Sequence, residues 1–268
     1  MIDCHCHLAD NQFKSDIEGV IERAKQSNVL ATLVCSEYRQ QFSKVFELAE
    51  KFPGFCFPCL GVHPIQKIKE DDVSVRLDDF ESVAEIIDQN HAKIAAIGEV
   101  RYNVGLDFSP RYLKSADAKE QQILVFKSQM DMALKYDLPL NVHSRSAGRP
   151  VIELLQKYGA RRVLLHAFDG NEKNAQPAID AGYYFSIPPS FSNSEKKIKL
   201  IERIPLGQLC LESDSPVLGP KKGERNEPKN IFISAEFIAN IKKIPLEDVI
   251  KITTENAKKL FPFLKQLK

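Results

Sequence analysis

Short apolar runs rich in β-branched residues alternate along the chain with longer stretches in which apolar residues recur at helical spacing. The short runs predict strands at residues 2–8, 29–35, 55–61, 94–100, 139–143, 163–167, 183–187 and 209–212. Helices are predicted between and after them, at residues 13–26, 40–51, 77–89, 119–136, 151–158, 175–181, 195–203, 231–241 and 246–260. Alternation of strands and helices indicates a parallel sheet.

Eight strand–helix units favour closure into a (β/α)8 TIM barrel, in which the C-terminal strand ends form one mouth that carries the active site. A doubly wound open sheet is the main structural alternative. No glycine-rich phosphate-binding turn follows an early strand, which counts against a dinucleotide-binding fold. Because no linker-like or low-complexity segment interrupts the pattern, we expect residues 1–268 to form a single domain.

Composition narrows the possible partners. The formal net charge of +1 excludes binding driven by overall basicity, so a polyanion would have to meet a local patch. No apolar run is long enough to span a membrane, and no signal segment opens the chain. We therefore expect a soluble intracellular protein, cytoplasmic or nuclear or both, with no membrane contact and no obligate protein partner.

The cysteines lie mostly in apolar, strand-like runs, where a free cysteine behaves as a small hydrophobic residue. They are Cys4, Cys6, Cys35, Cys56, Cys59 and Cys210. The spacing of Cys56 and Cys59 resembles half of a zinc site, yet no second pair of cysteines or nearby pair of histidines completes it. A structural zinc ion is therefore not expected there.

The first predicted strand carries the clearest chemical signal. Asp3, His5 and His7 alternate with Cys4 and Cys6, so strand geometry places the two imidazoles on one face and the two cysteines on the other. Two imidazoles so placed could hold one metal ion, or they could be core histidines bonded to carbonyl groups. A metal site predicts further ligands at the ends of other strands, whereas core histidines do not require them.

Polar residues do follow other strands, at their C-terminal ends. They include His63, Glu99, His143, Arg145, His166, Glu212 and Asp214. Five of the six histidines are thus expected at the mouth, with only His91 elsewhere. Mixed imidazole and carboxylate ligands suit Zn²⁺, Mn²⁺ or Fe better than Ca²⁺. Six of these residues are candidate ligands, which exceeds the needs of one catalytic ion, so we expect two ions that share Glu99. The six are His5, His7, Glu99, His143, His166 and Asp214.

An ordered set of motifs resembles the TatD family of metal-dependent deoxyribonucleases. The motifs are Asp3-x-His5-x-His7 and the segments 61–64, 97–100, 143–145, 166–170, 211–216, 225–228 and 254–261. They extend over essentially the whole chain. Residues 141–150 are similar to the animal TatD-domain-containing branch of this family, which is part of the amidohydrolase superfamily.

The resemblance implies a (β/α)8 barrel with a binuclear site. One ion would be held by His5, His7 and Glu99, and the other by Glu99, His143, His166 and Asp214. Family members cleave DNA phosphodiester bonds, commonly as 3′ to 5′ exonucleases, and some cleave at apurinic sites. We therefore expect a deoxyribonuclease with two divalent ions, Mg²⁺, Mn²⁺ or Zn²⁺, that acts on single-stranded DNA, 3′ ends or damaged DNA.

One segment departs from the family pattern. The family usually continues from Gly-Glu-Val directly to Gly-Leu-Asp-Phe, whereas this chain has four additional residues in between. They are Arg101, Tyr102, Asn103 and Val104. Because they follow the expected bridging ligand Glu99, they could redirect the next loop, and no family role is carried over to Asp107.

Phosphodiester hydrolysis also needs groups that move protons. Asp214 is placed to accept a proton from the attacking water while touching a metal ion, although pure metal ligation is the alternative. Glu212 should share its face and could orient ligands or substrate, or form a structural salt bridge. His63 is assigned to phosphate contact or to protonation of the leaving group.

Two arginines are candidates for contact with phosphate. Arg145 offers a planar fork of donors, with a surface ion pair as the alternative. Arg225 ends the loop 221–225, which we expect over the mouth, where it could follow a DNA backbone or simply be solvated.

Two other functions fit much of this pattern. One is a binuclear amidohydrolase that acts on a small amide, lactone or nucleobase; many such enzymes bridge their metals with a carboxylated lysine, and Glu99 in that place argues against it. The other is a catalytically weak scaffold that keeps the metal site for stability. The intact set of ligand types counts against a scaffold.

Overall fold

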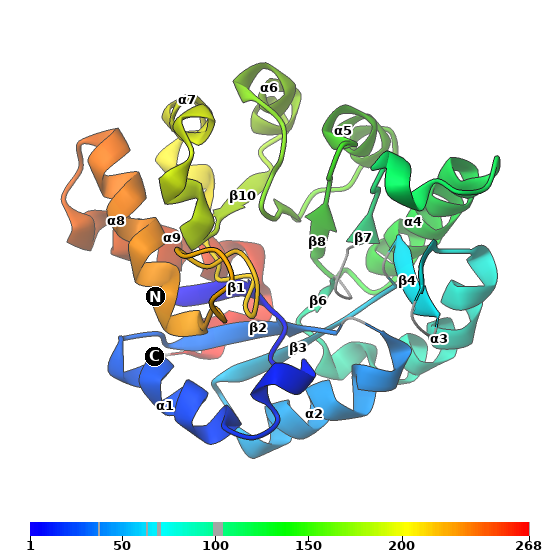
Figure 1. Cartoon of the computed structure of the whole chain (residues 1–268), viewed down its shortest axis with the longest axis horizontal. Coiled ribbons are helices and arrows are strands. Elements are labelled where there is room, and N and C mark those ends of the chain that lie inside the picture. The colour runs from blue at the N-terminus through cyan, green and yellow to red at the C-terminus, as the bar shows by residue number, and fades with distance from the viewer. Residues whose placement is uncertain (37, 63, 69–70, 99–103, 268) are drawn as a thin grey trace.

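The computed structural model describes residues 1–36, 38–62, 64–68, 71–98 and 104–267 (Figure 1). Two expected site residues, His63 and Glu99, lie outside these ranges, as do residues 101–103 of the insert.

Eight parallel strands of the described chain form a closed barrel. They are β1 (Ile2–Cys6), β2 (Ala31–Cys35), β3 (Cys56–Leu60), β6 (Ala96–Ile97), β8 (Leu140–His143), β9 (Val163–Leu165), β10 (Tyr184–Ile187) and β11 (Leu209–Leu211). Each strand pairs with the next, and β11 pairs with β1, which closes the ring. The predicted TIM barrel is therefore confirmed, and the doubly wound sheet is excluded.

Helices surround the barrel (Figure 1). They are α1 (Ile17–Gln26), α2 (Phe42–Lys51), α3 (Leu77–Asn90), α4 (Ala118–Lys135), α5 (Gly148–Lys157), α6 (Glu172–Asp180), α7 (Glu195–Arg203), α8 (Ile231–Lys242) and α9 (Leu246–Leu260). Each predicted helix is present. The first begins later than predicted, because a short 3-10 turn, η1 (Asn11–Phe13), precedes it and is capped by the Asp10 side chain. In the described part of the chain, no helix is both long and apolar enough to cross a membrane.

The buried core has two parts. One lies between the strands and the helices around them and includes Val34, Leu48 and Val151. The other fills the barrel interior and includes Cys210 together with Phe261 from the end of the chain. The helix α9 and the residues after it thus close the barrel on the side away from the mouth.

Strand β1 contains an irregularity that simple alternation does not predict. Asp3 pairs with Thr32 but Cys6 pairs with Val34, so β1 has one extra residue relative to β2. A bulge of this kind redirects the side chains around it. Cys4 consequently packs in the barrel interior and Cys6 in the outer layer. The expectation that these two cysteines share a face was wrong.

Two segments near the fourth barrel position were not predicted. The antiparallel hairpin of β4 (Ile65–Ile68) and β5 (Asp71–Ser74) lies between β3 and α3. Its charged sequence has no apolar run of the kind used to find strands. The short strand β7 (Val104–Gly105) begins at the last residue of the insert. It pairs with β8 beyond the point where β6 does, so it continues the barrel wall.

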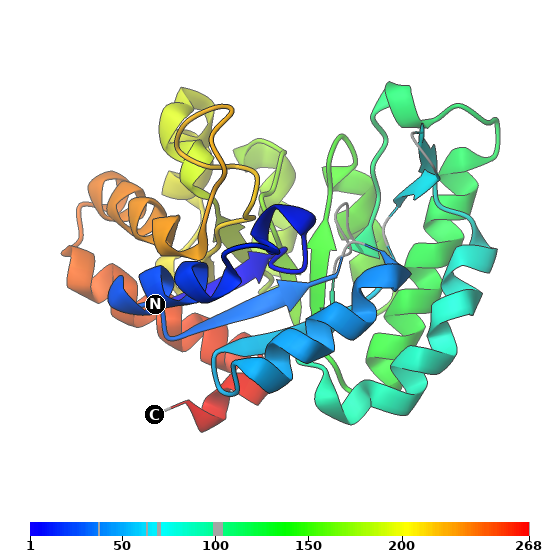
Figure 2. The same cartoon turned by 60° about the horizontal axis from the view of Figure 1, so that its bottom comes forward.

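The mouth faces upward in Figure 2. There the green strand β8 points up, and the orange segment that follows β11 stands at the same end, while the red end of the chain lies at the bottom. The segment after β11 is therefore placed beside the C-terminal strand ends.

Candidate metal centre

Four histidines meet at the mouth of the barrel. His5 lies on β1, His7 directly follows it, His143 ends β8 and His166 follows β9. Nε2 of His5 lies 3.2 Å from Nε2 of His7, and Nδ1 of His143 lies 3.2 Å from Nε2 of His166. The rings of His5 and His166 stack with centroids 4.0 Å apart. The predicted gathering of histidines at the strand ends is confirmed for these four.

Asp214 joins this cluster from the segment after β11. Its Oδ1 lies 3.2 Å from Nε2 of His7 and 3.6 Å from Nε2 of His5. The backbone N–H of Asp214 donates to the His5 carbonyl at 2.9 Å. Its φ of 51° is left-handed, a conformation that aspartate tolerates better than most residues. The bond to β1 and this turn together direct the carboxylate at the two imidazoles.

His5 and His7, here called the β1 histidines, each have an oxygen atom next to Nδ1, on the side of the ring away from the cluster. Nδ1 of His5 lies 3.0 Å from Oδ1 of Asn141, and Nδ1 of His7 lies 3.2 Å from the Cys35 carbonyl. The Asn141 amide nitrogen donates to the Cys4 carbonyl at 2.9 Å, which fixes the orientation of this side chain. An acceptor at Nδ1 holds the ring proton there and leaves the Nε2 lone pair facing the cluster.

At His166, a carboxylate lies on the side of the ring away from the cluster. Oε2 of Glu212 lies 3.5 Å from Nδ1 of His166. The Glu212 carboxylate also accepts the Ala167 N–H at 2.9 Å and the Ser186 hydroxyl at 2.5 Å, so it is held from three sides. Carboxylates placed in this way orient metal-binding imidazoles and make them more basic.

Burial determines the charge of these groups. Loss of hydration, together with the neighbouring His166 and His7, lowers the pKa of His5 well below its usual range. His5 is therefore neutral near pH 7, which is the form that binds metals. Burial raises the pKa of Glu212, against the opposing hydrogen bond from His166. Burial also raises the pKa of Asp3, which accepts hydrogen bonds from Ser213, to about 8.

The described residues fit a divalent ion. Two groups have ligand atoms within 4.8 Å of one another: His5, His7 and Asp214, and His5, His166 and Glu212. The first group offers two imidazoles and a carboxylate, a donor set typical of Zn²⁺, Mn²⁺ or Fe. In the second group, the Glu212 carboxylate already accepts two hydrogen bonds, which suits an orienting group better than a ligand.

The family model described as TatD related DNase matches residues 2–262. The chain belongs to this family. It is 50% identical over 268 residues to deoxyribonuclease TATDN3 of Homo sapiens, covering all of this chain and 96% of the human protein. It is 48% identical over 268 residues to putative deoxyribonuclease TATDN3 of Mus musculus, covering all of this chain and 90% of the mouse protein.

A solved TatD homologue has the same barrel. The crystal structure of YjjV from Escherichia coli K12 superposes with a TM-score of 0.83 at 26% identity and covers 98% of both chains. Guanine deaminase from C. acetobutylicum superposes with a TM-score of 0.63 at 12% identity, covering 97% of this chain and 72% of that one. At that identity the second likeness shows the fold alone.

Asp107 lies beside His143 despite the insert before it. Gly105 pairs with His143, which restores the register with β8. The buried Gln122 side chain accepts the Asp107 N–H at 2.9 Å and donates to the Asp107 carbonyl at 3.0 Å. Oδ1 of Asp107 accepts the Ser109 N–H, and Oδ2 faces Nε2 of His143 at 3.9 Å. This buried Oδ2 accepts no hydrogen bond within the described chain, so it is available to His143.

Replacing Gly105 with alanine should test this register. A Cβ at Gly105 would lie 2.1 Å from the His143 carbonyl oxygen, and φ is +138°. We expect Gly105→Ala to lower the free energy of unfolding by about 2–3 kcal/mol in a urea titration. Gly182→Ala is the matched control, because φ is +76° and no atom lies within 4 Å of the added Cβ. Equal losses in both variants would contradict the close approach of β7 to β8.

The two predicted phosphate-binding arginines lie in different surroundings. Arg145 is half-buried just after β8, and its carbonyl accepts the Phe108 N–H at 3.2 Å. The Arg225 guanidinium donates to both Asp16 oxygens, at 2.8 and 2.6 Å, and to Glu227 at 3.1 Å. These bonds lower the pKa of Asp16 to about 2. Arg225 thus anchors its loop, and its contact with phosphate stays a prediction.

Several orienting groups were missed from the sequence. Asn141 has a detectable signal, because it interrupts the apolar β8 two residues before His143. Ser186 resembles an ordinary small residue in a strand. The Cys35 carbonyl leaves no sequence signal, because every residue has one.

Proposed function

We propose that this protein is a divalent-metal-dependent deoxyribonuclease that hydrolyses DNA phosphodiester bonds. Its family and the names of its relatives support this proposal. One structural observation carries it: the four described mouth histidines each turn one ring nitrogen to the cluster, and at His5 and His7 the other ring nitrogen lies within hydrogen-bond distance of an oxygen atom. Such oxygen atoms fix the tautomers that metal-binding imidazoles need.

We propose two ions in this centre. The β1 histidines and Asp214 would hold one, and His143 and His166 the other, with Glu99 as the shared ligand. The short contacts of Asp214 with the β1 histidines support this division, which differs from the one that the resemblance implies. The many imidazole ligands favour Zn²⁺ or Mn²⁺ over Mg²⁺.

The bound ions would supply positive charge at the phosphate and acidify water. Asp214 would accept a proton from the attacking water, because its buried carboxylate faces the imidazoles from one side of the centre. Glu212 and Asp107 would hold the rings of His166 and His143 in place. His63 would protonate the leaving oxygen atom or contact the phosphate, and Arg145 and Arg225 would contact the phosphate.

We further propose that the substrate is single-stranded or damaged DNA, that cleavage proceeds from the 3′ end, and that apurinic sites are cleaved as well. Oligonucleotides labelled at either end test the direction. Early release of a 3′ label as mononucleotide, with the 5′ label retained in shortening products, is expected. Early release of the 5′ label would refute the direction, and a resistant apurinic duplex would refute the second activity.

Replacing Arg145 should affect substrate binding. Arg145→Ala is expected to raise KM for single-stranded DNA about tenfold or more, since a charge-assisted bond contributes about 1.5–3 kcal/mol. Metal content should not change. Arg149→Ala is the control, because this exposed side chain pairs with Glu153 on the α5 surface. An unaltered KM in Arg145→Ala would refute its phosphate contact.

The proposed compartment is the cytoplasm, the nucleus or both. All six cysteines are buried free thiols, which suits a reducing compartment.

A further inference from the structure

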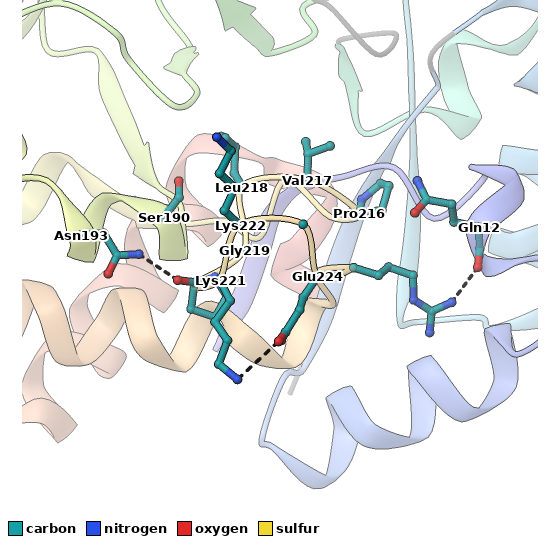
Figure 3. Close-up of a pocket in the computed structure, with 13 residues that line it drawn as sticks. Gln12, Ser190, Asn193, Pro216, Val217, Leu218, Gly219, Lys221, Lys222 and Glu224 are labelled. Atoms are coloured by element: carbon teal, nitrogen blue, oxygen red, sulfur yellow. Dashed lines mark hydrogen bonds and ion pairs between the residues drawn. The ribbon is translucent and has the colours of Figure 1, made fainter.

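A pocket lies beside the mouth, in the segment that follows Asp214 (Figure 3). Its volume is about 430 Å³. Three loops form its walls: η1 with Gln12, the turn η5 (Pro189–Asn193), and the segment of residues 216–225, here called the 216–225 loop. This volume lies in the range of small-ligand pockets.

Hydrogen bonds tie the 216–225 loop to the turn η5. The Ser190 N–H donates to the Leu218 carbonyl at 2.9 Å. The Asn193 side-chain amide donates to the Pro220 carbonyl at 2.8 Å, as Figure 3 shows. These bonds preform the pocket, so a ligand would not have to order its walls.

The other side of the loop is tied to the metal centre and to η1. The buried Asn226 side chain donates to the carbonyls of Ser213 and Val217, at 2.6 and 2.9 Å. Arg225 donates to the Gln12 carbonyl at 2.6 Å. Pro216, which lines the pocket, follows Asp214 by two residues, so the pocket directly adjoins the segment that carries this carboxylate.

The charged groups that line the pocket are mostly cationic. Lys221 and Lys222 are both exposed. Lys221 contacts Glu224 at 3.4 Å, but these side chains are 73% and 65% exposed, so the pair is weak. No ion pair of Lys222 is present within the described residues.

We propose that this pocket binds a backbone phosphate of the DNA chain near the bond that is cleaved. The inference rests on the proposed nuclease function. Proteins that bind single strands follow the backbone with a cationic groove. With a net charge of only +1, this chain needs a local patch for that purpose, and Lys221 and Lys222 supply one at a preformed pocket.

The double variant Lys221→Ala/Lys222→Ala tests the proposal. We expect KM for a twelve-nucleotide single strand to rise about five- to tenfold, as for loss of two phosphate contacts. The dependence of log KM on log salt should become shallower by about 1.4, because each contact with a single strand contributes about 0.7. The loss on bis(p-nitrophenyl) phosphate, which has no chain to reach the pocket, should be at least fivefold smaller. Lys221→Arg/Lys222→Arg should restore both DNA readouts.

Lys251→Ala is the matched control, because Lys251 is exposed on α9. An unchanged KM and salt slope for the twelve-nucleotide strand in the double alanine variant would overturn the DNA subsite. Binding of inorganic phosphate that is lost in that variant, with DNA kinetics unaltered, would overturn it in favour of a free-phosphate site. Failure of the nuclease proposal is distinct, because the wild-type protein would then cleave neither substrate.

Discussion

Asp214→Asn is expected to lower kcat for metal-dependent DNA hydrolysis by about 1,000-fold or more, within the range that general acid–base groups contribute. The amide keeps the shape of the carboxylate but cannot accept a proton and no longer carries a negative charge toward His5 and His7. The variant should still fold, because asparagine tolerates the left-handed backbone at this position. kcat at saturating metal measures the effect.

Asp131→Asn serves as the control, because Asp131 is exposed on α4. It should retain wild-type kcat. A thermal scan of both variants separates loss of function from loss of fold. If the folded Asp214→Asn protein keeps the wild-type kcat, the proposed roles of Asp214 in proton transfer and in metal binding are both wrong.

Phe261→Ala is expected to have the largest effect on stability. Phe261 is fully buried where the end of the chain closes the barrel interior. Truncating a buried phenylalanine costs about 3–5 kcal/mol, because it removes apolar contacts and leaves a cavity. We expect urea titration to show this loss and Tm to fall by roughly 6–20 °C.

Phe263→Ala is a matched control two residues along the chain. Phe263 is 36% exposed and contacts Phe57 edge-on, with ring centroids 6.2 Å apart. We expect its truncation to cost less than about 1.5 kcal/mol, because less apolar surface leaves the core. Similar losses in both variants would show that the barrel interior does not depend on this closure.

The barrel was predictable because parallel strands buried on both faces appear in the sequence as continuous apolar runs. Runs such as residues 31–35 and 163–165 therefore mark the barrel wall. Hairpin β4–β5 was not predictable in this way, because its strands are charged and lie outside the barrel. The bulge in β1 also leaves no pattern, since it depends on the pairing with β2.

Only part of the metal centre was predictable from the sequence. Histidines and Asp214 at strand ends could be found, because the fold gathers those ends. The contact of Asp214 with His5 and His7 could not be predicted, since it depends on the turn at Asp214. Likewise, Gln122 and the Gly105 pairing, which place Asp107 behind His143, are contacts between distant elements.

Metal reconstitution tests the central claim most directly. The protein is stripped with a chelator and titrated with Zn²⁺, Mn²⁺ or Mg²⁺, while bound metal per chain and hydrolysis of single-stranded DNA are measured on the same samples. We predict no hydrolysis by the stripped protein and recovery that reaches its maximum at two ions per chain. Cleavage by the stripped protein, or metal binding at the mouth without any cleavage, would contradict a metal-dependent deoxyribonuclease.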